Sequence, residues 1–245
     1  MSRLRYKPLL IPGYFLLWLV LLSQIHFPAA SPFFWLLLIA LALWNADFYS
    51  GLIHIYLDYR PLDKSKGFDK LFYYPASRDS AEFQQMKHQV LSRSSYLEKV
   101  VYNFKIHHRT VRHYQLYTYR DFFYELMPAG AILLGLSGLL LLLPQNLWRD
   151  SLAFILLMCS LIAIHTNHIH ACVHGSKTMP HGVKVVRWLQ KRHLMYSNKT
   201  HNSHHKNGIS GFCLIWGGAD FLVDRICAWL LRRNIISRAE WRGER

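Results

Sequence analysis

The sequence predicts an all-α integral membrane protein with about four transmembrane helices and a helical, histidine-rich cytoplasmic cap. Hydrophobic residues make up 52% of the 245 residues and are gathered into long runs, whereas charged residues make up only 18%. Such clumped apolar content excludes a disordered chain. The formal charge of +15 would suit nucleic acid, but the apolar runs point instead to an anionic membrane surface, and no nucleic-acid partner is expected.

Four segments have the apolar character of spans: residues 8–27, 32–57, 122–143 and 151–173. A span needs about 20 residues at 1.5 Å each. The second and fourth reach that length only with polar C-terminal turns, which we expect to emerge at the membrane surface. The first also has the pattern of a signal peptide, and we expect it to stay uncleaved as an anchor. The whole chain, 1–245, is expected to form one membrane-embedded domain.

The basic residues predict the orientation of these spans. In a four-span arrangement, 28 of the 29 Lys and Arg residues fall on one side, which holds both termini, residues 58–121 and residues 174–245, and only Arg149 falls on the other. The positive-inside rule makes the basic side cytoplasmic. Of the 15 histidines, 14 lie on or near that side. Residues 60–103 are expected to form an amphipathic cytoplasmic excursion, with a solvated charged loop as the alternative.

Two small groups of polar residues lie near the cytoplasmic ends of the second and third spans. His54 and Asp58 are four residues apart, so they share a helix face and could address one metal ion. A polar pair at a helix end is the equally good alternative. The neighbours His107 and His108 point about 100° apart on a helix, so this doublet serves two nearby metals better than one. His113 follows five residues later.

Two further histidine groups follow the fourth span. His170 and His174 share a helix face. His165 and His168 lie on a different face, which favours a structural role for His165 and a place beside the site for His168. The last group is H-x-x-H-H, whose spacing predicts three imidazoles on one helix face within a single turn: His201, His204 and His205.

Together the four groups hold eight histidines, and these are the candidate metal ligands: His54, His107, His108, His170, His174, His201, His204 and His205. A structural zinc takes four ligands, so eight fit two metals. The four cysteines form no C-x-x-C pair, so neither a disulfide framework nor a thiolate site is expected. The number of ligands leaves iron, zinc and copper open.

The order H-x-x-x-D, H-H, H-x-x-x-H, H-x-x-H-H resembles that of the Kua-type lipid desaturases. That family includes plasmanylethanolamine desaturase and the plastid enzyme that desaturates palmitate on phosphatidylglycerol. The likeness runs from about Asp47 to Asp224, with signatures at residues 47–54, 166–175 and 200–213. The step Asp121-Phe122, with Glu125, resembles the start of the third span in that family. Arg120 resembles the plastid type, and Cys172 stands where the family usually has tryptophan.

The resemblance implies a membrane di-iron site that uses O2 to remove two hydrogens from a lipid chain. It implies two iron ions per chain and an external electron donor of the cytochrome b5 or ferredoxin type. By position it implies the eight histidines as ligands and Asp58 as a ligand or an anchor of one. His113 is a candidate for a missing ligand. Three basic residues near the site are candidates for holding a phospholipid headgroup, with ordinary positive-inside charges as the equally good alternative: Arg109, Arg112 and Lys199.

The chemistry of the substrate fits that reading. An unactivated methylene has no acidic proton, so its C–H bond requires a cofactor rather than acid–base side chains. A site at the interface favours carbons close to the glycerol, on an acyl or a 1-O-alkyl chain. The alternatives are a hydroxylase with the same di-iron site and a non-enzymatic metal-binding membrane protein. A transporter would place ligands at broken helices near mid-membrane, where these spans are expected to be uninterrupted. The oligomeric state is left open.

Overall fold

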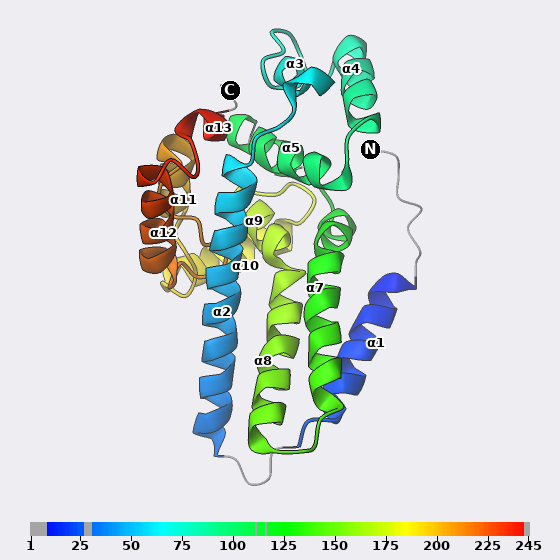
Figure 1. Cartoon of the computed structure of the whole chain (residues 1–245), viewed down its shortest axis with the longest axis vertical. Coiled ribbons are helices and arrows are strands. Elements are labelled where there is room, and N and C mark those ends of the chain that lie inside the picture. Colours follow the sequence, from blue (N-terminus) through cyan, green and yellow to red (C-terminus); the bar gives the residue numbers. More distant parts are fainter. Residues whose placement is uncertain (1–8, 27–30, 111, 116, 243–245) are drawn as a thin grey trace.

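The computed structural model describes residues 9–26, 31–110, 112–115 and 117–242, and every regular element in those ranges is helical. Figure 1 shows long helices at one end of the molecule and a cap of shorter helices at the other. Two of the long helices run away from the cap, α1 (Leu10–Ser23) and α7 (Tyr119–Leu141), and two run back toward it, α2 (Pro32–Tyr59) and α8 (Leu147–Ala163).

The starts of α2 and α7 are visible in the sequence. Extended Ser31 precedes Pro32 at the first helical position of α2, where proline's missing N–H costs nothing. Thr118 and Asp121 form a capping box at the start of α7, and this box explains why an acidic residue stands there. The 28 residues of α2 measure about 42 Å. Because a hydrocarbon core is about 30 Å thick, one end of α2 must project beyond it.

The expected continuous helix over residues 151–173 is instead broken. α8 ends at Ala163, and after a bend of 41° α9 (Thr166–Val173) begins. At the break, His165 Nδ1 donates to the Leu161 carbonyl at 2.7 Å and Thr166 Oγ1 donates to the Ile162 carbonyl at 3.2 Å. Side chains that bond to carbonyls one turn back compete with the helix's own ladder and bend it.

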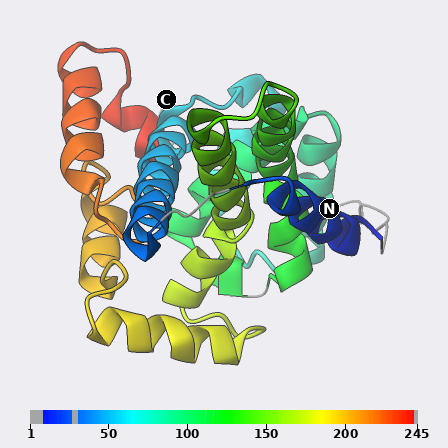
Figure 2. The same ribbon diagram turned by 90° about the horizontal axis from the view of Figure 1, so that it is seen from below.

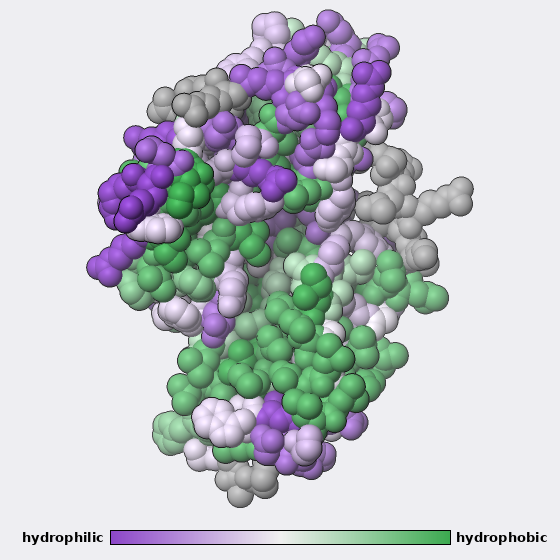
Figure 3. All heavy atoms as spheres, in the orientation of Figure 1, coloured by the Kyte–Doolittle hydropathy of each residue, from purple (hydrophilic) through white to green (hydrophobic). Residues whose placement is uncertain are grey.

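Two helices, α2 and α7, are long and apolar enough to cross a membrane, and the α8–α9 pair is a third if it counts as one span. The four-span count is therefore not confirmed. The helix that is too short is α1, whose 14 residues measure about 21 Å, less than the thickness of a hydrocarbon core. α1 packs on α8, where the Tyr14 hydroxyl and the Trp18 indole donate to the carbonyls of Ser160 and Leu157. Figure 3 shows a hydrophobic surface around these helices and a hydrophilic one over the cap.

The first part of the cap, over residues 60–110, folds around its own core. Its elements are η1 (Lys64–Lys66), α3 (Phe68–Phe72), α4 (Ala81–Ser92) and α5 (Tyr96–Arg109). Phe68, Leu71 and Tyr102 are among the buried residues that join them. The capping box of Ser95 and Glu98 starts α5, which leads to the candidate doublet at its last turn.

The second part of the cap follows α9. Its helices are α10 (Pro180–Lys191), α11 (Asn198–Asn207), α12 (Asp220–Arg232) and α13 (Arg238–Arg242), and α6 (Arg112–Gln115) lies between α5 and α7. Figure 2, which looks from the bundle end, shows α10 lying crosswise to the long helices. The chain thus brings α2, α5, α9 and α11 together where the bundle meets the cap (Figure 1).

Candidate metal centre

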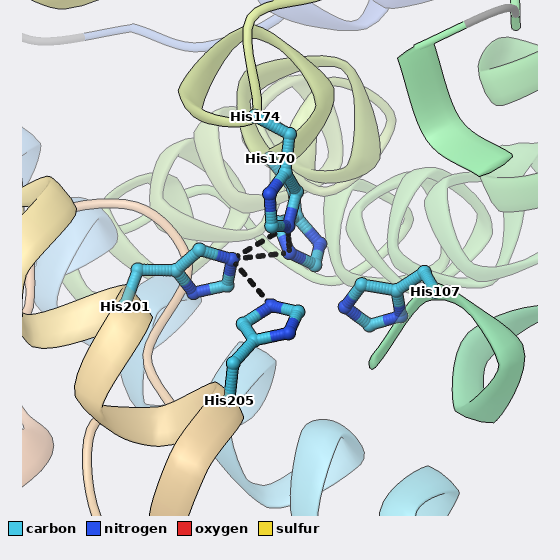
Figure 4. A group of neighbouring side chains, drawn as sticks. All are labelled: His107, His170, His174, His201 and His205. Carbon is cyan, nitrogen blue, oxygen red and sulfur yellow. Dashed lines mark hydrogen bonds between the residues drawn. The ribbon is translucent and has the colours of Figure 1, made fainter. Parts of the chain in front are cut away.

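Two groups of side chains meet where the bundle joins the cap. The five-histidine group holds His107, His170, His174, His201 and His205 (Figure 4). The aspartate group holds His54, Asp58, His108 and His204. Within each group, one ligand atom from every residue lies within 4.8 Å of all the others. All eight candidate histidines therefore fall into one group or the other.

The two groups are neighbours because the His107-His108 doublet divides between them. The ring centroids of the doublet are 4.3 Å apart, and those of His108 and His205 are 4.5 Å apart. The H-x-x-H-H motif divides too. His201 and His205 differ by about 40° around α11, whereas His204 is about 100° from His205. The expectation that all three imidazoles share one face was therefore wrong, since His204 joins the aspartate group.

In the five-histidine group the Nε2 atoms converge on one point. The distances are 3.0 Å from His170 to His201, 2.7 Å from His201 to His174, and 3.0 Å from His205 to His201. Nitrogen ligands that bind one ion at about 2.1 Å and at right angles lie about 3.0 Å apart. The spacing of these nitrogens is thus that of ligands around a common ion.

Asp58 lies at the centre of the other group. Its carboxylate oxygens lie 2.9 Å from His108 Nε2, 3.2 Å from His204 Nε2 and 3.4 Å from His54 Nε2. Its side chain is fully buried. A buried carboxylate requires compensating charge, and a metal cation held by these four side chains would provide it.

Backbone carbonyls fix the orientation of several rings. His54 Nδ1 donates to the Phe212 carbonyl at 2.7 Å, His204 Nδ1 donates to the Ser210 carbonyl at 2.9 Å, and His107 Nδ1 donates to the Phe104 carbonyl. This arrangement leaves the lone pair on Nε2, which is how metal-ligating histidines are commonly held. The Nε2 atoms of all three are buried without a hydrogen-bond partner among the described residues. The donor set therefore fits metal ions.

The segment that carries Phe212 is pinned to α2 by Asp47. The Asp47 carboxylate accepts from the backbone N–H groups of Ile215, Trp216 and Ala219 at 2.9–3.2 Å. A Cβ on Gly51 would lie 3.0 Å from Cys213 Sγ and from both γ-carbons of Val223, so a larger residue would push these side chains away from α2. The signature at residues 47–54 thus has a physical reason: it positions the carbonyl that orients His54.

Burial keeps four histidines of the five-histidine group neutral. Burial, reinforced by neighbouring histidines, lowers the pKa of His107 and His201 well below the ordinary value. The same causes lower the pKa of His174 to about 4 and that of His205 to about 2. Neutral imidazole is the form that binds metals, so these rings are ready to act as ligands at neutral pH.

Several candidate residues lie outside both groups. His113 Nε2 is hydrogen-bonded to the Tyr117 hydroxyl at 3.2 Å, and His168 packs edge-on against the ring of Tyr119. Among the headgroup candidates, the Arg109 guanidinium lies over the Tyr73 ring and donates to the Phe72 carbonyl, whereas Lys199 is exposed on α11. Arg112 lies in α6, and its side chain is outside the described residues.

The structure adds residues that the sequence did not single out. The ring of Tyr114 stacks on His107 with centroids 4.8 Å apart, and its buried hydroxyl has no hydrogen-bond partner among the described residues. Tyr196 packs edge-on against His201, and Trp241 packs against His108. The spacing of residues along the chain does not predict these contacts. For example, α5 ends at Arg109, so Tyr114 does not lie on the same helix as His107.

Comparison with known proteins gives one match. Residues 93–240, more than half of the chain, match the family model described as a lipid desaturase domain. The match contains seven of the eight candidate histidines, and His54 and Asp58 lie before its start. No curated protein and no solved structure matches the chain.

Proposed function

The chain belongs to the lipid desaturase family, and we propose from this that it is a membrane di-iron, O2-dependent desaturase. Its proposed substrate is a fatty acyl or 1-O-alkyl chain of a glycerophospholipid, and the double bond forms near the headgroup. The observation that carries the proposal is the pair of adjoining metal-binding groups that divide the His107-His108 doublet between them. If the protein bound a single metal ion, one of these two groups would have no ion to bind.

The eight histidines and Asp58 would hold the two iron ions. Iron at these groups would supply the oxygen chemistry that breaks an unactivated C–H bond, which no side chain of the chain can do alone. The protein's own part is orientation and exclusion of water. The Nδ1 bonds to carbonyls aim the Nε2 atoms inward, and buried Phe104 and Phe212 pack against His54.

The position of the site supports a bond near the headgroup. His54 is the twenty-third residue of α2, which starts at Pro32, so it lies about 33 Å along the helix. That length matches the thickness of the hydrocarbon core. A lipid whose headgroup rests at this surface would bring the first carbons of its chain, and not the terminal ones, to the site.

The stoichiometry requires a redox partner. Removing two hydrogens from the chain while O2 is reduced to two waters uses two further electrons and two protons. We therefore include a donor protein of the cytochrome b5 or ferredoxin type in the proposal. The excess of basic residues on the cap side supports placing the metal centre and this partner in the cytoplasm.

The orientation has a direct test. Cysteines introduced at Trp148, exposed at the far end of the bundle, and at Lys206, exposed on α11, should differ in labelling by an impermeant thiol reagent. In whole cells only position 148 should react, and both should react after lysis. Equal labelling in intact cells would refute the multi-pass topology.

The reaction is tested by expressing the chain in cells that lack glycerophospholipids with a double bond near the headgroup, and by feeding these cells deuterated precursors. Mass spectrometry should show phospholipids that have lost two hydrogens, and the change should be absent without O2 and absent in His201→Ala. Purified protein should contain about two irons per chain. A gain of one oxygen atom would identify a hydroxylase instead, and one zinc without iron would refute the di-iron centre.

A further inference from the structure

Helix α10 has three distinct stripes of side chains, because residues three or four apart share a helix face. Val183 and Val186 are buried and pack with Cys172 of α9. Lys184, Arg187 and Lys191 are all exposed and form a basic stripe. The third stripe, Val185 and Trp188, is apolar yet exposed.

Val185 and Trp188 are 57% and 51% exposed, respectively. The Arg192 guanidinium lies over the Trp188 ring, 4.2 Å from its centroid, so a cation stacks on the face of the tryptophan. A soluble surface helix would have polar residues at these positions. An apolar stripe beside a basic one, with tryptophan at the boundary, is the pattern of a helix that lies in a membrane interface.

The orientation of α10 agrees with that pattern. Figure 2 shows its axis crossing the direction of the long helices, so it lies parallel to the plane of a membrane that the bundle would span. Its buried stripe packs against α9, which continues the bent third span. In Figure 1 α10 lies behind α2 and level with α9, where the apolar bundle gives way to the cap.

We propose that α10 is an in-plane anchor that binds anionic phospholipids of the leaflet on the cap side. Val185 and Trp188 enter the boundary between headgroups and acyl chains, and Lys184, Arg187 and Lys191 contact lipid phosphates. Basic residues near an anionic surface attract its lipids, and the attraction is screened by salt. This inference does not depend on the proposed reaction.

The test uses the full chain in lipid nanodiscs, with a fluorophore on Val185→Cys. All four native cysteines are buried, which limits background labelling. One set of discs contains phosphatidylcholine with a minor share of brominated phosphatidylcholine, and the other has the same share of brominated phosphatidylserine. Quenching by the anionic lipid should exceed quenching by the neutral lipid by about threefold or more at low salt. High salt should bring the two values together.

A variant with Lys184→Ala, Arg187→Ala and Lys191→Ala should lose the preference for the anionic lipid. The matched control carries Lys64→Ala, Lys70→Ala and Arg93→Ala, three exposed residues of η1, α3 and the end of α4, and it should keep the preference. Equal quenching by both lipids in the unmutated background would overturn the anionic preference. Quenching by aqueous iodide, without quenching by either lipid, would show that α10 does not lie on the membrane.

Discussion

The two candidate metal-binding groups differ in how many of their side chains the protein backbone orients. In the aspartate group, His54 and His204 are oriented by backbone carbonyls, and both are fully buried together with Asp58. Among the described residues, His107 alone has such a bond in the five-histidine group. The Nδ1 atoms of His170, His201 and His205 are buried without a partner among the described residues. Backbone carbonyls therefore orient two of the three histidines of the aspartate group, whereas the five-histidine group relies more on the packing of its rings.

The groups also differ in charge. Asp58 gives the aspartate group a fixed acidic ligand that attracts a cation, while the five-histidine group contains only imidazoles. His174 and His205 of the latter are only partly buried. We infer that the aspartate group retains metal more tightly, and that the five-histidine group is the more open of the two. The predictions below test this contrast.

The largest expected effect comes from removing one ligand from each group. His170→Ala and His204→Ala should each lower activity more than about 100-fold and reduce iron from about two to about one per chain. Elemental analysis and product assays would measure both. His88→Ala, an exposed histidine on α4, is the control and should change neither quantity. Retention of two irons by either variant would remove that residue from the ligand set.

Asp47→Asn should weaken the aspartate group without touching its ligands. The substitution removes the charge that three backbone N–H groups share, and a hydrogen bond to a charged group contributes about 1.5–3 kcal/mol. We expect the free energy of unfolding to fall by about 3 kcal/mol and iron loss to be confined to the aspartate group. Thermal melts and Mössbauer spectra of the two iron sites would show this. Asp63→Asn, at the exposed cap of η1, is the control.

The sequence predicts the parts of the two groups that lie on a single helix. The pairs His54/Asp58 and His170/His174 each lie in one group, as spacing by four residues predicts, and α2 and α7 end within a few residues of the expected spans. The placement of His204 and His201 in different groups could not be predicted from the sequence, because it depends on which other helices pack against each side of α11. The bend after α8 has no proline or glycine to mark it, and Tyr114 reaches His107 only through tertiary packing.

Acid should disturb the five-histidine group in the metal-free protein. The pKa of His174 is lowered to about 4 and that of His205 to about 2, from 6.5. Below about pH 6.5 the unfolded chain therefore binds protons that the folded chain does not, so stability falls as the pH drops toward the folded pKa values. The loss between pH 7 and pH 5 should reach about 2 kcal/mol for each residue. Melts of the metal-free protein and of His205→Gln at both pH values would test this; equal losses would contradict it.

The smallest effect is expected at His113, which the sequence offered as a replacement for a missing ligand. Its ring lies outside both groups, and its Nε2 is hydrogen-bonded to the Tyr117 hydroxyl at 3.2 Å. His113→Gln should therefore cost only one neutral hydrogen bond, about 1 kcal/mol, and the protein should keep about two irons per chain and nearly full activity. Iron analysis decides the matter, because a ligand cannot be lost without lowering the metal content. A fall to one iron, with folding shown to be intact by circular dichroism, would contradict this prediction. It would mean that His113 is a ligand and that the two groups do not contain all the ligands.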